Sequence, residues 1–181
     1  MRKKRPAELR FQSLECISTV TTRIEEVRNE VTQLAQATSS AREFMQGMVK
    51  MLHERMLKYN WVGFYMLEPG AEPPMLILGA FEGAMTPHTR IPLNEGICGA
   101  AASSGETVVV DDVNKDPRYL ACSLETKSEI VVPVFARGKV VGELDIDSHF
   151  PAAFTQEHKE FVQYCALLAG KKLEASGPGQ V

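Results

Sequence analysis

Residues 129–148 are the stretch that most limits how this chain can fold. Their sequence, EIVVPVFARGKVVGELDIDS, reads as two strands at residues 129–136 and 140–147, with continuous apolar runs such as 130–132 and 140–141. Between the strands lies a short turn sequence in which Gly138 can adopt a positive φ. This pattern predicts a β-hairpin. Because the apolar residues are continuous rather than alternating, both strands are expected to be covered on both faces.

Four acidic residues interrupt this apolar hairpin. Glu129 opens the first strand, and Glu143, Asp145 and Asp147 occupy every second position of the second strand. A period of two places these three on one face. Because unpaired carboxylates are costly to bury, this face is either a solvated sheet end or the floor of a ligand site. If the carboxyls converge, repulsion should raise the pKa of at least one of them.

Length and composition limit the class of protein. The chain has 181 residues, of which 44% are hydrophobic and 24% are charged, which fits one globular domain with an added helical segment. The net charge of −3 gives no general case for binding nucleic acid or an anionic membrane. Neither a secretory signal nor a stretch of transmembrane length is predicted, so we expect a cytoplasmic protein.

The cysteines of a cytoplasmic protein should be mostly reduced. The spacings of Cys16, Cys98, Cys122 and Cys165 match no zinc or CxxC pattern, so neither a metal nor another cofactor is predicted. Cys98 and Cys122 lie outside the flanking helices, between strands, where a cysteine is a better redox candidate than on a helix face. For Cys98 the alternative is simple packing of a small helix.

Helix and strand signals follow one another in an order that predicts the fold class. Helices are expected at residues 12–37, 41–58, 96–103 and 156–174, with Asn94 and Thr155 as caps of the last two. Strands are expected at residues 61–67, 75–80, 88–93, 107–110, 129–136 and 140–147. Short connections make most neighbouring strands antiparallel. We predict an α+β fold: about six mainly antiparallel strands, with N- and C-terminal helices on one face and ligand-pocket loops on the other.

A heptad pattern marks residues 12–37. Apolar residues recur at spacings of three and four at Ile17, Val20, Ile24, Val27, Val31 and Leu34. This narrow stripe favours a two-stranded coiled coil in a homodimer; the alternative is an amphipathic helix docked on its own domain. The predicted divisions are a helical segment at residues 1–38, one domain at 39–173 and a flexible tail at 174–181.

The strand at residues 61–67 adds two aromatic candidates. Trp61 and Tyr65 lie on one face of that strand, where they either wall an apolar pocket or belong to the core.

Several segments together resemble a GAF domain over about residues 40–172. They are residues 90–99 (RIPLNEGICG), 111–114 (DDVN), 128–133 (SEIVVP) and 142–148 (GELDIDS). Within GAF domains the chain is most similar to the free methionine-(R)-sulfoxide reductase group. That similarity rests on residues 60–65 (NWVGFY), Cys98, Cys122 with the alanine before it, and the LDID end of the hairpin.

The resemblance implies a thiol-dependent reduction of free methionine-(R)-sulfoxide. In that group a thiolate attacks the sulfoxide sulfur, the cysteine becomes a sulfenic acid, a second cysteine forms a disulfide, and thioredoxin restores the thiols. Carried over, Cys122 is the catalytic thiol and Cys98 its resolving partner, with the order of attack left open. Trp61 and Tyr65 would wall the S-methyl end. The amino group and the sulfoxide oxygen would be held by the acids Glu129, Asp145 and Asp147.

Two features depart from that group. Its members commonly have a third cysteine two residues before the Arg-Ile-Pro sequence, where this chain has His88. The heptad helix looks more like the signalling helix that precedes a sensory GAF domain. The alternative function is therefore a non-catalytic GAF domain that binds a small ligand in a signalling dimer.

Overall fold

The computed structural model describes residues 6–120 and 123–176, with side chains in the first helix described from residue 22 onward. The elements are α1 (Pro6–Ala37), α2 (Ala41–Arg55), β1 (Trp61–Leu67), β2 (Met75–Glu82), β3 (Arg90–Pro92), α3 (Gly96–Ser104), β4 (Val108–Val110), the 3₁₀ turn η1 (Val113–Lys115), β5 (Ser128–Ala136), β6 (Lys139–Ser148) and α4 (Gln156–Ala175). None of the helices in these ranges is long and apolar enough to cross a membrane.

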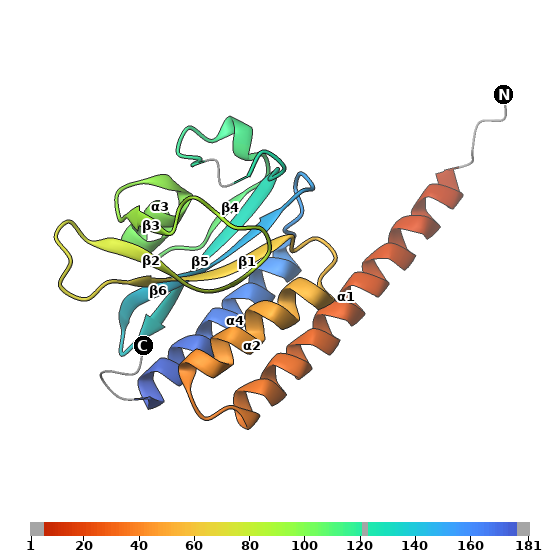
Figure 1. Ribbon diagram of the computed structural model, residues 1–181. Helices are drawn as coiled ribbons and strands as arrows, with labels where there is room; N and C mark the ends of the chain where they lie inside the picture. The colour runs from red at the N-terminus through yellow and green to blue at the C-terminus, as the bar shows by residue number, and fades with distance from the viewer. Residues whose placement is uncertain (1–5, 121–122, 177–181) are drawn as a thin grey trace.

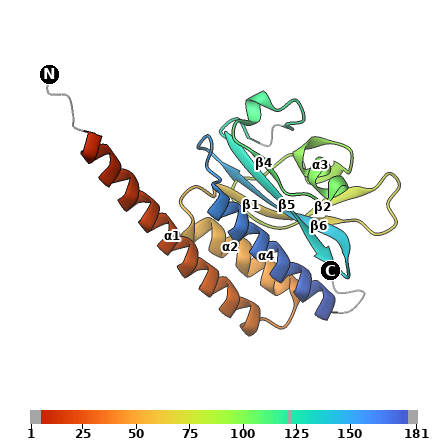
Figure 2. The ribbon, with the colours of Figure 1, turned by 180° about the vertical axis from the view of Figure 1, so that it is seen from behind.

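A single antiparallel sheet in the order β3-β2-β1-β6-β5-β4 separates two layers. The helices α1, α2 and α4 cover one face, and α3 with the loop that carries η1 lies on the other (Figures 1 and 2). The period of two decides which core each residue joins. In β1, Val62 and Phe64 join the helical core, whereas Trp61 and Tyr65 join the core beneath α3. The predicted α+β architecture is confirmed.

The hairpin of β5 and β6 lies at the centre of the sheet. Arg137 (φ 52°) and Gly138 (φ 74°) both take left-handed conformations at its turn, as a tight hairpin with right-handed strand twist requires. β6 pairs with β1 on one side and β5 on the other. Because helices cover one of its faces and α3 the other, β6 is buried on both faces for most of its length.

The described part of α1 packs on its own domain. Ile24, Val27 and Val31 are buried in one core with α2 and α4. The Arg28 guanidinium lies 4.1 Å from the centre of the Tyr164 ring on α4. The docked helix that we held as the alternative is therefore what these residues form, and Ile24 and Val31 are unavailable as a dimer seam. Toward its start, α1 extends away from the sheet and the other helices (Figure 1).

Several expected boundaries were wrong by a few residues. α2 ends at Arg55, because Met56 takes an extended backbone conformation. β2 continues to Glu82, so part of the expected loop is strand. Asn94 does not cap α3: Glu95 has the cap position, without a side-chain hydrogen bond. The predicted cap at Thr155 is confirmed, since its hydroxyl accepts a hydrogen bond from the His158 backbone N–H.

Truncation of Val31 tests whether α1 belongs to the core of the single chain. We expect Val31→Ala to lower the free energy of unfolding by roughly 1–3 kcal/mol, because it leaves a cavity among α1, α2 and α4. Urea unfolding would measure the loss, which should not vary with protein concentration. Asn29→Ala, on the exposed face of α1, is the matched control. A loss that appears only at high concentration would contradict packing within one chain.

Candidate functional site

Four carboxyl groups and one thiol meet on the face of the sheet covered by α3. Glu129 is directly opposite Asp147 across β5 and β6, and Asp145 lies two pairs further along, opposite Val131. The Cys98 thiol, on α3, lies 3.5 Å from Asp145 Oδ2 and 3.9 Å from Glu129 Oε1. Glu143 is the fourth acid, and each of the four carboxyl residues is 5% exposed or less. The acids therefore converge in a closed site, with Cys98 above them.

Two glycines position α3 and hence Cys98. A Cβ on Gly99 would lie 2.8 Å from the Leu93 carbonyl oxygen, so only glycine lets the helix lie this close to the end of β3. Gly96 begins the helix with φ 73°, a conformation that glycine adopts without steric cost. The Leu120 side chain lies directly over Gly96. The loop that follows β4 thus packs against the first turn of α3.

Aromatic rings form a wall beside the acids. The Trp61 ring stacks on Phe81 with centroids 5.9 Å apart and lies 6.1 Å from the Tyr65 ring. A Cβ on Gly63 would collide with the Trp61 ring, so glycine is required for the indole to lie across the strand. Gly63 pairs with Asp145 on β6, which places the indole next to the acidic cluster. Trp61 and Tyr65 were predicted from the sequence as wall residues, but Phe81 was not. The apolar run of β2 was the only sequence pattern that could have indicated Phe81.

Hydrogen bonds fix the polar ends of these rings to the segment that follows β2. Trp61 Nε1 donates to the Ala84 carbonyl oxygen at 3.0 Å. The Tyr65 hydroxyl donates to the His88 carbonyl oxygen at 2.7 Å. The backbone of His88 therefore adjoins the aromatic wall.

Burial raises the pKa values of all the acidic groups in the site. It raises the pKa of Glu143 to about 8, with a smaller opposing effect from the Cys98 thiol. Burial and then repulsion from neighbouring carboxylates raise the pKa values of Glu129, Asp145 and Asp147. The same two causes raise the pKa of the Cys98 thiol. At neutral pH the site therefore holds protons, as the sequence predicted for at least one carboxyl.

Glu143 is the acid that sequence analysis left out of the site. It is 0% exposed, and neither of its carboxyl oxygens has a hydrogen-bond partner among the described residues; the same holds for Asp145 Oδ1. A buried polar group without a partner costs stability. Its position two residues before Asp145 was the available signal. These oxygens are therefore available to a polar or cationic group that enters the cluster.

The remaining cysteines are not part of the described site. Cys165 is buried on α4 in the helical core, as expected for a helix-face cysteine. Cys122 and the Cys16 side chain lie outside the described residues. On either side of Cys122 the chain is placed: the Tyr119 hydroxyl donates to the Ser123 carbonyl oxygen at 3.1 Å, and Leu120 packs in the same core as Cys98.

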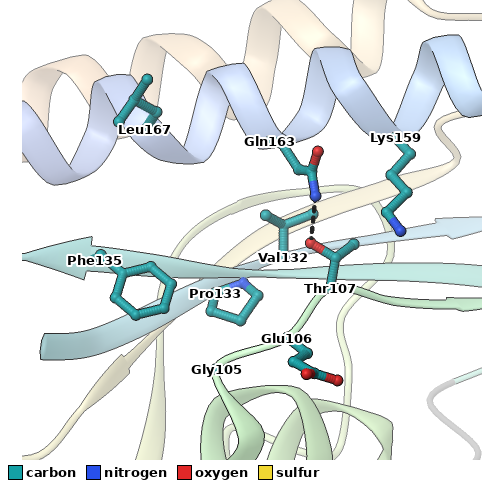
Figure 3. A pocket seen from close by; sticks show the side chains of 9 residues that line it. All are labelled: Gly105, Glu106, Thr107, Val132, Pro133, Phe135, Lys159, Gln163 and Leu167. Carbon is teal, nitrogen blue, oxygen red and sulfur yellow. Dashed lines mark hydrogen bonds between the residues drawn. The ribbon is translucent and has the colours of Figure 1, made fainter. Parts of the chain in front are cut away.

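An open surface cavity lies elsewhere on the molecule. It has a volume of about 570 Å³ and lies between α4, β5 and the turn after α3. Figure 3 shows Gln163 and Thr107 joined by a hydrogen bond of 2.9 Å across it. Its lining includes neither Cys98 nor any of the four acids. This cavity is therefore separate from the acidic cluster.

Comparison with known proteins agrees with this architecture. The GAF domain family matches residues 40–173, and the chain belongs to that family. It is 45% identical to the free methionine-R-sulfoxide reductase of Saccharomyces cerevisiae over 113 residues, which are 62% of each chain. It is 36% identical to the enzyme of the same name from Escherichia coli over 110 residues, 61% of this chain and 64% of the relative.

A solved structure extends the similarity over more of the chain. The free methionine-R-sulfoxide reductase of Neisseria meningitidis, solved in complex with its substrate, matches with a TM-score of 0.79 and 34% identity. The match covers 84% of this chain and 89% of that one. The alignments to the yeast and E. coli relatives, by contrast, span less than two thirds of those proteins.

Replacing Glu143 by glutamine tests the acidic site through stability. The pKa of Glu143 rises from about 4.5 unfolded to about 8 folded. Between these values the native state holds a proton that the unfolded state has lost, so stability falls as pH rises through this window. Glutamine does not titrate. Glu143→Gln should therefore gain stability over the wild type, by at most about 1.4 kcal/mol per pH unit.

Urea unfolding at pH values of about 5, 6.5 and 8 would measure this gain. Glu25→Gln, on the exposed face of α1, is the control and should leave a small, constant difference from the wild type. A constant difference for Glu143→Gln as well would show that Glu143 is ionised in the folded protein, contrary to its burial.

Proposed function

We propose that this chain reduces free L-methionine-(R)-sulfoxide to methionine with a cysteine thiol and disulfide cycle. One observation carries the proposal: a closed cluster of four acids beneath the Cys98 thiol, bordered by the Trp61 and Tyr65 rings. Two relatives and a structural neighbour named as enzymes of this activity support it. The substrate combines an ammonium group, a polar sulfoxide and an apolar methyl, and the site offers a partner for each.

The acids would have two roles: they would bind the ammonium group and donate a proton to the sulfoxide oxygen. An ammonium group entering the cluster makes ionised carboxylates favourable, because an opposite charge nearby offsets the cost of burial. Glu129, Asp145 and Asp147 are the residues that we assign to this group and to the sulfoxide oxygen. A carboxyl that remains protonated can donate its proton to that oxygen as the S–O bond weakens. The S-methyl group would lie against Trp61 and Tyr65.

The redox steps balance with two thiols and an external dithiol. The Cys122 thiolate attacks the sulfoxide sulfur, the oxygen passes to that cysteine as a sulfenic acid, and methionine forms. The Cys98 thiol then attacks the Cys122 sulfur, a disulfide forms and water leaves. A dithiol reductant reduces this disulfide and is itself oxidised. Methionine sulfoxide thus gains two electrons, which the reductant supplies.

The environment of Cys98 disfavours this thiol as the first nucleophile. Burial and the surrounding carboxylates raise its pKa, and a protonated thiol is a poor nucleophile. The first attack is accordingly assigned to Cys122, on the loop after β4. Since no third cysteine stands at His88, turnover would depend on the Cys98–Cys122 pair alone.

The reductant and cellular setting remain part of the proposal. A thioredoxin-like protein is the reductant that this chemistry requires, because it exchanges dithiol for disulfide. A cytoplasmic location would keep both thiols reduced between turnovers.

Homodimer formation through the first part of α1 is proposed separately. Ile24 and Val31 are occupied by the chain's own core, so this proposal places the dimer seam at the earlier heptad positions, Ile17 and Val20. The division into a helix at residues 1–38, a GAF domain at 39–173 and a tail at 174–181 belongs to this proposal. The extension of α1 away from the body (Figure 1) also favours the second candidate function, a sensory GAF domain that binds a small ligand in a signalling dimer.

Single-turnover assays with the four cysteine variants test the enzyme proposal. With a thioredoxin-type reductant, the wild type should convert the R epimer of free methionine sulfoxide catalytically. Cys122→Ser should form no methionine, because the attacking sulfur is gone. Cys98→Ser should form about one methionine per chain and then stop, because the sulfenic acid cannot proceed to a disulfide.

The controls are Cys16→Ser and Cys165→Ser, which should retain catalytic turnover. Full activity in Cys122→Ser would contradict its role as the nucleophile. Absence of methionine formation in the wild type, together with tight binding of a small ligand, would instead support the sensory function.

Sedimentation tests the dimer. The wild type should sediment as a dimer, and Ile17→Glu combined with Val20→Glu should give a folded monomer, because charges at adjacent heptad positions destabilise a coiled-coil seam. Glu25→Lys, at an exposed position of α1, should remain dimeric. A monomeric wild type would rule out this association.

A further inference from the structure

We propose that Cys98, Glu129, Asp145 and Glu143 also form a binding site for a thiophilic divalent cation, of which Zn²⁺ is the best fit, and that the bound cation excludes the sulfoxide substrate. The exclusion rests on the proposed function; cation binding does not. No metal pattern exists in the sequence, because the donors come from α3, β5 and β6 and meet only in the fold.

The donor geometry suits a tetrahedral cation. One ligand atom each from Cys98, Glu129 and Asp145 lie within 4.8 Å of one another. Zn–S and Zn–O bonds of about 2.3 and 2.0–2.2 Å place a sulfur and an oxygen of one tetrahedron about 3.5 Å apart. The Cys98 sulfur is 3.5 Å from the Asp145 oxygen and 3.9 Å from the Glu129 oxygen. Small side-chain shifts would therefore bring all three onto one ion.

A second observation points independently to a ligand. Glu143 is fully buried, and both of its oxygens lack hydrogen-bond partners among the described residues, as does Asp145 Oδ1. The Cys98 thiol is close enough to affect the ionisation of Glu143, so this carboxyl adjoins the same space. A cation would supply a partner for these oxygens, with Glu143 as the fourth ligand.

The donor set also selects among cations. A thiolate is a soft ligand and favours Zn²⁺ over Mg²⁺ or Ca²⁺, which prefer oxygen ligands alone. A divalent cation would neutralise part of the negative charge of the cluster, as the substrate ammonium is proposed to do. Because both would occupy the same acids, binding of one should prevent binding of the other.

Cobalt titration tests the site directly, since Co²⁺ substitutes for Zn²⁺ and reports thiolate ligation by its absorption. The full reduced protein should bind Co²⁺ with a thiolate-to-cobalt charge-transfer band, and Zn²⁺ should remove the band. Cys98→Ser should lose the band. Glu143→Gln should weaken binding about tenfold or more, as loss of a supporting ligand does in other metal sites.

Matched variants make the result specific. Cys165→Ser and Glu25→Gln should bind Co²⁺ like the wild type. Circular dichroism would verify folding; if Cys98→Ser does not fold, Glu143→Gln decides the outcome. Loss of the band in Cys122→Ser with its retention in Cys98→Ser would overturn the site, as would unchanged binding in Glu143→Gln.

Displacement of Co²⁺ by the sulfoxide distinguishes failure of the cation site from failure of the proposed function. Free methionine-(R)-sulfoxide should reduce the cobalt band in proportion to its concentration, and Zn²⁺ should inhibit turnover until a chelator is added. A cobalt band that the sulfoxide leaves unchanged would overturn the exclusion. A protein that binds Co²⁺ through Cys98 but forms no methionine would overturn the proposed function and leave the cation site standing.

Discussion

The cost of keeping four carboxyl groups out of water governs this molecule. β6 lies between β1 and β5, with helices over one face and α3 over the other, so Glu143, Asp145 and Asp147 are each 4% exposed or less. Water stabilises the charged form of a carboxyl far more than a protein interior does. The fold without a ligand therefore retains protons on this cluster, and the pKa values of the acids rise accordingly.

Such a site is tolerated because apolar cores lie on both sides of the sheet. Two separate cores, one on each side of the sheet, hold the strands in place and stabilise a hairpin that its own acids destabilise. Functional sites commonly combine local strain with a scaffold stable enough to tolerate it. The protonated acids can also bind a cationic group, because the cation replaces the protons and balances the charge of the carboxylates that remain.

The sequence predicted that the acids share one face of β6, but not how deeply they are buried. A period of two depends only on β6 itself, so the alignment of Glu143, Asp145 and Asp147 was readable from the chain. Their burial depends on α3, whose position no local signal reveals. The prediction that the heptad stripe of α1 forms a dimer seam failed at Val31 for a related reason. An apolar stripe predicts that a helix face is covered, but not whether the same chain or a partner covers it. Val31 packs against α2 and α4 of its own chain. Thr155 caps α4 as predicted, because a cap depends on neighbouring residues alone. Asn94 does not cap α3, because the helix begins at Gly96 and Glu95 therefore has the cap position.

The position of Cys98 links the electrostatics to an order of events. With the acids partly ionised and nothing bound, the thiol is held protonated by burial and by their negative charge. A cation in the cluster changes this balance, because it compensates the carboxylates and makes a thiolate less costly. Under the proposed function, Cys98 is therefore a weak nucleophile until a cationic group enters the cluster. For a sulfoxide ligand that timing suits a resolving thiol, which is needed only after the first attack has occurred. For a metal ion the same change creates a thiolate ligand. In the proposed mechanism and the proposed cation site, the acids respond to positive charge, and the identity of the cation decides whether Cys98 acts as a redox thiol or as a metal ligand.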